Sequence, residues 1–459
     1  MSTAVRPTLF ALALPIFIEN AMHVLTSTID VLMVSTISDG AVAGLGVAHQ
    51  FVMVAIMVFS FVGIGSSVVV THSLGGGDKT GARETAVAAI SVNLWLGVLL
   101  SIVMALNVSP LLRLMQVPAE LFVYAQPYLF ILGATLWLEA HNVSIGAVLR
   151  AHGHATDAMW VTLIQNIINA VGNAVLLFGL FGAPKMGITG VALATVFSRV
   201  VAAAIMIYLL YRRTGIRLRF ADLFRVPVER LKRILRIGLP SAGEHLCWWI
   251  AYMTTTSFVA RMGATELATQ SYTMQIVHFV FTFSFSFALA NEILVGHHIG
   301  AGRFDEAYNT LIRTLKVGLP IVVAALIPMA IFGPNVLEWF TDDTAIIATG
   351  TILLRISLLI EPARLVCMVM VCSLRATGDV VYPLKLGLVA MWGVWVPLSW
   401  LFGITLGWGL PGIWCAIMVD ATIRGSLFMR RWMKRKWMTN AQKSRDGVTA
   451  SIANLADSA

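Results

Sequence analysis

Charged side chains are scarce in this 459-residue chain and make up only 12% of it. A soluble protein carries about twice that share, so the composition excludes a soluble globular protein. Hydrophobic residues make up 58% instead. Cysteine is also scarce: the four cysteines lie within apolar segments and form no CxxC pair. This argues against a disulfide framework or a zinc site.

Sequence signals of an enzyme are missing as well. No Gly-Lys dipeptide occurs, so the chain lacks the GxxxxGK[ST] loop of nucleotide hydrolases. The glycine run 75–77 lacks that spacing, and we interpret it as a tight turn. We find no catalytic triad, no paired carboxylates of a hydrolase and no histidine spacing typical of zinc. We therefore expect no enzymatic activity and no cofactor.

Long apolar runs fill most of the sequence. About 20 helical residues cross the ~30 Å hydrocarbon core of a membrane, and helices satisfy their own backbone hydrogen bonds there. We predict an all-α integral membrane protein with twelve spans. The spans lie at 9–35, 44–72, 86–109, 121–149, 158–181, 187–211, 239–260, 266–296, 311–333, 345–374, 381–404 and 409–429.

The second half of the chain repeats the first at an offset of 225 residues. Matches of polar and turn-forming residues at one offset are rare by chance in so apolar a chain. They include Leu14-Pro15 with Leu239-Pro240, Glu19 with Glu244, His72 with His297, Gly75 with Gly300, and Leu149-Arg150-Ala151 with Leu374-Arg375-Ala376. Six spans per half is an even number, so both halves enter the membrane from the same side. This predicts two parallel six-helix repeats around a central cavity.

Four segments follow from this organisation. Residues 1–211 form an amino-terminal lobe, 212–238 a basic cytoplasmic linker, and 239–430 a carboxyl-terminal lobe. The polar residues 431–459 are predicted to form a basic, disordered cytoplasmic tail.

Basic residues determine the predicted orientation. With a cytoplasmic amino terminus, the outer loops hold only Arg113, Lys185 and Arg261 of the 32 basic residues, and most others lie in inner loops and tails. The positive-inside rule then places both termini in the cytoplasm. The net charge of +9 is explained by contact with anionic membrane lipid. The basic patches lack interleaved aromatic residues, so no nucleic-acid partner is expected, and we expect a monomer.

Asp30 is the most informative ionisable residue in a predicted span, since a charge there costs ~2.5–3.5 kcal/mol. No basic residue lies within a helical turn of it. Asn169 and Asn173 are four residues apart and share a helix face, and Thr195 lies in the next span. Together they offer a carboxylate, two amide oxygens and a hydroxyl. This set could hold Na⁺, with Asp30, Asn169 and Asn173 as its ligands, or a protonatable acid.

Other polar residues in the spans are candidates for the wall of a substrate cavity. Glu19 and Glu244 each follow a proline by four residues, so they either face the cavity or bond backbone that the proline frees. Glu139 and Arg364 are repeat mates. Arg364 either pairs with Glu361, three residues earlier, or receives an anionic part of a substrate.

Two further groups are open to a structural reading. For Glu292, Arg355, Asp420 and Arg424 we favour positions near the interface or packing ion pairs, and Asp420 and Arg424 are spaced to pair. Four tryptophans could line an adaptable cavity wall, or could pack helices or form an interfacial belt. They are Trp248, Trp249, Trp392 and Trp395.

The order of these motifs resembles the multidrug and toxic compound extrusion (MATE) family over nearly the whole chain. The matching segments are Leu14-Pro15 before Asp30, the glycine loops 75–82 and 300–307, the Leu-Arg-Ala-x-Gly segments 149–153 and 374–378, Asn169-x-x-x-Asn173, 181–184 and 187–192.

The resemblance implies a bacterial transporter of the plasma membrane that expels amphipathic organic compounds, often cationic, in exchange for H⁺ or Na⁺. By resemblance, Asp30, Asn169, Asn173 and Thr195 correspond to the family's cation site in the amino-terminal lobe. The carboxyl-lobe site of the NorM branch is not matched, because Trp248 and Arg364 stand where its carboxylates would be.

We therefore predict antiport by alternating access, with two lobes rocking about the cavity and coupling at Asp30. The alternatives are a flippase for a lipid-linked intermediate and a transporter of the major-facilitator type. A channel or scaffold would need no coupling carboxylate. Neither the substrate nor the choice between H⁺ and Na⁺ follows from the sequence.

Overall fold

The computed structural model of the protein describes residues 8–224 and 227–457, which contain helices and no β-strand. The chain folds into two compact units. Unit 1 comprises the stretch up to Val70 and the stretch from Lys79 to Gly238. Unit 2 comprises residues 71–78 and the chain from Leu239 onward. The described structure is therefore all-α, as predicted.

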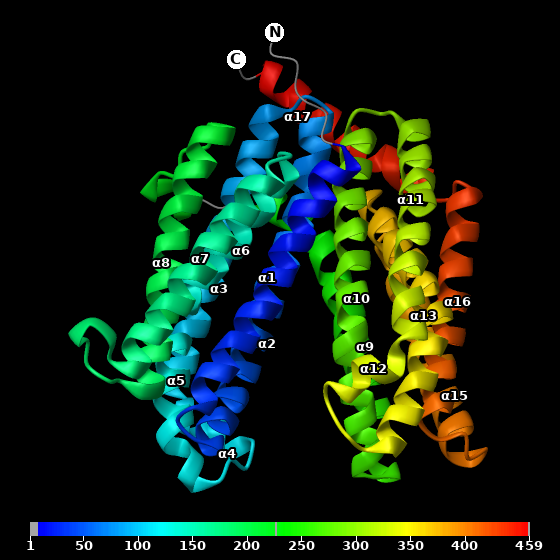
Figure 1. Cartoon of the computed structure of the whole chain (residues 1–459). Coiled ribbons are helices and arrows are strands. Elements are labelled where there is room, and N and C mark those ends of the chain that lie inside the picture. Colours follow the sequence, from blue (N-terminus) through cyan, green and yellow to red (C-terminus); the bar gives the residue numbers. More distant parts are fainter. Residues whose placement is uncertain (1–7, 225–226, 458–459) are drawn as a thin grey trace. The chain divides into compact units, whose positions relative to one another are not determined.

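The helices of unit 1 are coloured blue to green in Figure 1. They are α1 (Leu9–Ser35), α2 (Asp39–Gly75), α3 (Lys79–Leu106), α4 (Val108–Leu114), η1 (Ala119–Leu121), α5 (Phe122–Ala134), α6 (Leu136–Ala151), α7 (Ala155–Phe178), η2 (Leu180–Gly182), α8 (Gly187–Thr214) and η3 (Phe220–Leu223). The last residues of α2 belong to unit 2, and α9 begins in unit 1.

The helices of unit 2 run from green to red in the same view (Figure 1). They are α9 (Val228–Met262), α10 (Ala264–Gly300), α11 (Phe304–Ile331), α12 (Gly333–Glu338), α13 (Thr344–Ala376), α14 (Val381–Ala390), the π-helical turn η4 (Met391–Trp395), α15 (Val396–Trp400), the π-helical turn η5 (Leu401–Thr405), α16 (Gly409–Met433) and α17 (Met438–Asp457).

Each predicted span corresponds to one helix, to a helix pair or, for 381–404, to the consecutive segments α14 to η5. Within the described residues, ten helices are long and apolar enough to cross a membrane, or eleven if the bent pair α5–α6 is one span. The remaining predicted span, 239–260, lies in α9 but is not among these helices. This part of α9 is less apolar, since it contains Glu244, His245 and several hydroxyl residues.

The fourth span is bent rather than continuous. The helix containing α5 meets α6 at an angle of 51°. At the bend, the Thr135 hydroxyl donates to the backbone oxygens of Ile131, at 2.9 Å, and Leu132, at 3.2 Å. Such bonds often bend helices, but Thr85 and Ser91 make the same bond inside the unbroken helix α3, so the hydroxyl alone does not cause the break.

The internal repeat is visible in the structure. The short helices α4 and α12 start at Val108 and Gly333, at the 225-residue offset. In unit 2, a Cβ at Gly75 would lie 2.1 Å from the backbone oxygen of His297, and a Cβ at Gly300 would lie 2.0 Å from that of His72. Gly75 and Gly300 are repeat mates, as are His72 and His297. The two ends therefore contact each other reciprocally, as parallel repeats related by a pseudo-two-fold axis would.

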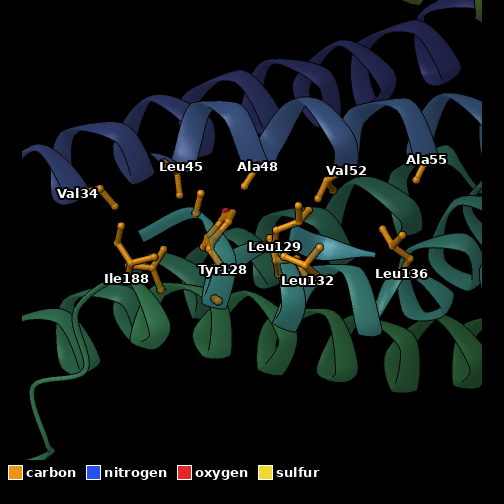
Figure 2. Packing of buried hydrophobic residues seen from close by; sticks show 14 of the residues in the cluster. Val34, Leu45, Ala48, Val52, Ala55, Tyr128, Leu129, Leu132, Leu136 and Ile188 are labelled. Carbon is orange, nitrogen blue, oxygen red and sulfur yellow. The ribbon is translucent and has the colours of Figure 1, made fainter. Parts of the chain in front are cut away.

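The core of unit 1 is built from one face each of several helices. Figure 2 shows Leu45, Ala48, Val52 and Ala55 of α2 facing buried side chains of α5, α6 and α8. These residues recur every three or four positions, which places them on one face of α2. The same cluster includes residues of α1, α6 and α7. It therefore packs α8 against the helices that carry the polar residues described below.

The prediction of a disordered tail is wrong for residues Met438–Asp457, because these residues form the helix α17. Trp437, just before it, stacks on Trp432 with ring centroids 4.5 Å apart. Asn440 donates to Asp379 at 3.1 Å. Ala441 and Val448 are buried. A mostly polar segment can thus form a helix when the face that carries its small and apolar residues packs against other helices.

The segment predicted as a linker, in its described parts 212–224 and 227–238, contacts α3 in unit 1. The indole of Trp95 donates to the backbone oxygen of Leu223 at 2.8 Å, and its ring lies 5.1 Å from that of Phe224. Arg230 forms an ion pair with Glu84 at 3.0 Å. This segment is therefore part of unit 1.

The close approach at Gly75 generates a stability prediction. Gly75→Ala forces a Cβ against a backbone oxygen, and we expect a loss of about 1–3 kcal/mol, as for overpacked cores. Gly46, in the same helix, has open space around it. Gly46→Ala should be neutral or add about 0.5–1 kcal/mol, because alanine is the better helix former. Thermal unfolding in detergent measures both, and equal stability of the two variants would contradict the tight crossing.

Candidate functional site

A chain of hydrogen bonds connects three helices of unit 1. From α7, the Asn173 side chain donates to Asp30 Oδ1 of α1 at 2.6 Å and to Asn169 Oδ1 at 3.2 Å. Asn169 in turn donates to the hydroxyl of Thr195, on α8, at 3.0 Å. The Thr195 hydroxyl donates to the backbone oxygen of Val191 at 2.9 Å. The four residues singled out from the sequence therefore form one continuous network.

The network contains an amide oxygen that no hydrogen-bond donor of the described residues reaches. Asn169 and Asn173 are buried, and Asn173 Oδ1 has no hydrogen-bond partner within the described structure. An unpartnered amide oxygen beside a carboxylate is a hard oxygen pair of the kind that suits a proton or an alkali cation. Among residues 8–224 and 227–457, no three His, Cys, Asp or Glu side chains gather to hold a metal ion.

A second polar pair lies near the network. Arg199, on α8, bonds Glu139 of α6 at 2.9 Å. Arg199 follows Thr195 by one helical turn and interacts electrostatically with Asp30 and with Tyr128, a residue of the buried cluster in Figure 2. Sequence reasoning identified Glu139 as a candidate but not its partner, Arg199.

Glu19 has a partner that sequence reasoning missed. Its Oε1 accepts from Arg150 of α6 at 2.8 Å, and both side chains are largely buried. Arg150 belongs to the first Leu-Arg-Ala segment. We had expected Glu19 either to face a cavity or to bond backbone freed by Pro15, and the ion pair offers a third role.

The corresponding arginine and glutamate of unit 2, Arg375 and Glu244, do not pair with each other. Arg375, the repeat mate of Arg150, forms a bidentate pair with Glu292 at 2.8 and 2.6 Å. Glu292 stands at the position of Ser67 in the first repeat. Glu244, the mate of Glu19, interacts electrostatically with Arg375, but the described residues offer it no ion pair within 4 Å. Glutamate instead of serine at this one position of α10 thus gives Arg375 a partner that Arg150 does not have.

Two further arginines of unit 2 pair along their own helices. Arg364 forms an ion pair with the fully buried Glu361 at 2.8 Å, so the local pair that the spacing allows is present. Arg424 donates to Asp420 at 2.9 and 2.5 Å, as the four-residue spacing predicted. Pairing lowers the cost of keeping these charges inside a membrane.

The tryptophans divide into two groups. Trp395 is only 2% exposed and packs in a core cluster with Ala251 and Met391. Trp248 stacks on Tyr252 with ring centroids 5.5 Å apart and lies 6.2 Å from Trp395. For Trp395 the structure therefore favours helix packing over a cavity wall. Trp249 and Trp392 remain 49% and 42% exposed.

A duplicated set of apolar helices with a buried polar network in one half is the construction of a secondary transporter of the membrane. The MatE family model matches residues 15–175 and again residues 240–401. The chain belongs to the MatE family, whose members are membrane transporters and not enzymes. The two matches begin 225 residues apart, which is the offset of the internal repeat.

Curated relatives agree with this assignment. The chain is 36% identical to the uncharacterized transporter YisQ of Bacillus subtilis, over 94% of each chain. It is 26% identical to a probable multidrug resistance protein NorM of Thermotoga maritima, over 97% of this chain and 96% of that protein. The protein is thus a multi-pass membrane transporter.

Solved structures show the same fold. A crystal structure of MATE in the bent conformation has a TM-score of 0.87 at 24% identity, over 95% of this chain and 96% of that one. A MOP superfamily transporter from Pyrococcus furiosus has a TM-score of 0.82 at 23% identity, over 96% and 95% of the chains. For that protein, a reverse polarity of the binding pocket is said to suggest a different function.

The Asp420–Arg424 pair generates a prediction about structural charges. Arg424→Met leaves Asp420, only 1% exposed, as a buried unpaired carboxylate, and should cost about 3–5 kcal/mol. The double variant Asp420→Leu/Arg424→Met should return close to the original stability, because a buried pair replaced by apolar residues is often neutral. Thermal unfolding in detergent measures both.

Arg355→Met, at an exposed position of α13, is the matched control and should change little. If the double variant is as unstable as Arg424→Met, the two residues do not act as an isolated pair.

Proposed function

We propose that this chain is a secondary active efflux transporter that exchanges an amphipathic organic compound for H⁺ or Na⁺. The hydrogen-bonded network from Asp30 to Thr195 supports this proposal most directly. It is also supported by relatives such as the NorM proteins, which are called probable multidrug resistance proteins. Membership of the MatE family sets aside the major-facilitator alternative. A lipid-intermediate flippase remains the second candidate.

Coupling at Asp30 follows from the bonds that this carboxylate makes. A proton or Na⁺ that neutralises Asp30 weakens its 2.6 Å bond with Asn173, because a charged acceptor bonds more strongly than a neutral one. The packing of α1 against α7 then changes, and with it the affinity of the transporter for its substrate. The two units alternate access by moving against each other.

The energy available is sufficient for useful efflux. The membrane potential supplies ~2.3 kcal/mol per charge per 100 mV. At ~150 mV, one coupling charge supports roughly 300-fold accumulation of a neutral solute. One titrating or ion-binding carboxylate per transport cycle is therefore enough.

Several further features belong to the same proposal. Both termini lie in the cytoplasm, the transporter acts as a monomer in the bacterial plasma membrane, and it uses no cofactor beyond the coupling ion. Glu244 and the exposed tryptophans contribute to the substrate path. Because Arg364 is neutralised by Glu361, Arg364 does not repel a cationic substrate.

Coupling is tested with Asp30→Asn, which keeps the shape of the side chain but cannot carry charge. In proteoliposomes, we expect substrate accumulation driven by an imposed gradient to fall towards equilibrium while substrate exchange persists. The matched control is Asp39→Asn, an exposed aspartate in the first turn of α2, which should leave accumulation unchanged. An Asp30→Asn protein with the original coupling would remove Asp30 from the mechanism.

The coupling ion and substrate class are tested by imposing a pH gradient or a Na⁺ gradient separately on proteoliposomes of the unmodified chain. We expect one of them to drive transport of a cationic dye against its gradient. An anionic flavin or conjugate in the same assay reports the charge preference. Transport of neither compound under either gradient, together with scrambling of a lipid-linked reporter, would favour the flippase instead.

A further inference from the structure

The end of α8 folds back on itself around a glycine. Gly215 has φ of 70°, a left-handed conformation that favours glycine, and its N–H donates to the Tyr211 oxygen at 2.9 Å. Ile216 follows and is only 3% exposed, so it anchors the returning chain. This turn brings Arg217 across the last turn of the helix.

Two arginines are oriented here by two tyrosines. Arg217 donates to the Tyr211 hydroxyl at 2.6 Å, and its guanidinium carbon lies 4.8 Å from the centre of that ring. Arg212 donates to the Tyr208 hydroxyl, also at 2.6 Å, and lies 5.9 Å from its ring. A guanidinium has five N–H donors, so each group keeps donors for an anion.

The neighbouring arginine is already neutralised. Arg213 forms a bidentate pair with Asp157 at 2.7 and 2.9 Å. Within the described residues, Arg212 and Arg217 form no ion pair within 4 Å, so both keep their positive charge.

Arg217 borders an apolar pocket, and Arg212 bonds Tyr208, which also lines it. A pocket of about 500 Å³ is walled by Ile207, Leu210, Ile216 and Leu218. The two tyrosines and Arg217 complete its lining. A small inorganic anion would leave these apolar walls without a partner, so the pocket favours a ligand that is charged at one end and apolar at the other.

An apolar stripe leads along α8 towards this pocket. Its members are exposed and spaced by three, four or seven residues, which places them on one helix face. They are Leu193, Phe197, Val200 and Ile207, with exposed fractions of 38%, 62%, 46% and 45%. On a membrane-spanning helix such a face contacts acyl chains, while tyrosine rings and arginines lie at headgroup level.

We propose that this end of α8 is a binding site for an anionic phospholipid. The phosphate lies between the guanidinium groups of Arg217 and Arg212, and one acyl chain follows the stripe from Ile207 towards Leu193. Charge complementarity with the anionic inner leaflet selects this ligand. The site rests on the proposed orientation, which puts this end of α8 at the cytoplasmic face, but not on the proposed transport activity, and its test measures lipid binding alone.

The test uses the purified full-length protein in detergent and native mass spectrometry with phosphatidylglycerol and phosphatidylcholine. We expect the unmodified protein to retain phosphatidylglycerol preferentially. Arg212→Gln and Arg217→Gln should each weaken its binding about fivefold, since a basic residue at the membrane surface contributes about 1 kcal/mol. Arg430→Gln, an equal loss of charge at the exposed end of α16, should leave binding unchanged.

Tyr211→Phe keeps the ring and removes the hydroxyl that orients Arg217, so it should weaken phosphatidylglycerol binding while phosphatidylcholine binding is unchanged. Three outcomes would overturn the proposal. The first is equal retention of the two lipids by the unmodified protein, which needs no variant to fold. The second is an equal effect of Arg430→Gln and Arg217→Gln. The third is full displacement of the lipid by inorganic phosphate, which would indicate a site for a free anion.

Discussion

The cost of placing a charge inside hydrocarbon governs the polar interior of this protein. A carboxylate or guanidinium in a membrane span costs ~2.5–3.5 kcal/mol unless it is paired. The structure matches five carboxylates of the spans with arginines: Glu19, Glu139, Glu292, Glu361 and Asp420. Asp30 instead bonds an amide. Asp30 therefore differs from the five carboxylates whose charge an arginine neutralises.

The internal duplication shows how two copies of one scaffold can diverge in function. The arginine of the Leu-Arg-Ala segment is present in both repeats, but Arg150 bonds Glu19 whereas Arg375 bonds Glu292. Glu292, a single acidic residue in α10, is sufficient for this change of partner. Glu244, the repeat mate of Glu19, is then left without the arginine partner that Glu19 has. The Asp30 network has no equivalent at the 225-residue offset, because Asp30 aligns with Thr255. The two halves therefore share a backbone and differ in their buried charges.

Helix positions were predictable because apolar length is a local property of the chain. The start of α1 at Leu9 and of α8 at Gly187 agreed with the predicted spans. The break at Thr135 was not predicted, because the Thr135 hydroxyl bonds the preceding turn just as hydroxyls inside unbroken helices do. Neither was α17, whose polar composition suggested disorder. Its stability depends on contacts such as that between Asn440 and Asp379, which are 61 residues apart.

The amino-acid sequence alone determined the membrane class, the repeat and the identity of the polar residues, because hydropathy, spacing and offset are read along one chain. It also placed Asn169 and Asn173 on one helix face. Only the tertiary structure decided which charges neutralise one another, because a partner such as Arg150 for Glu19 lies 131 residues away. It likewise decided that Asp30 bonds Asn173 and not an arginine, since that choice depends on how α1 packs against α7.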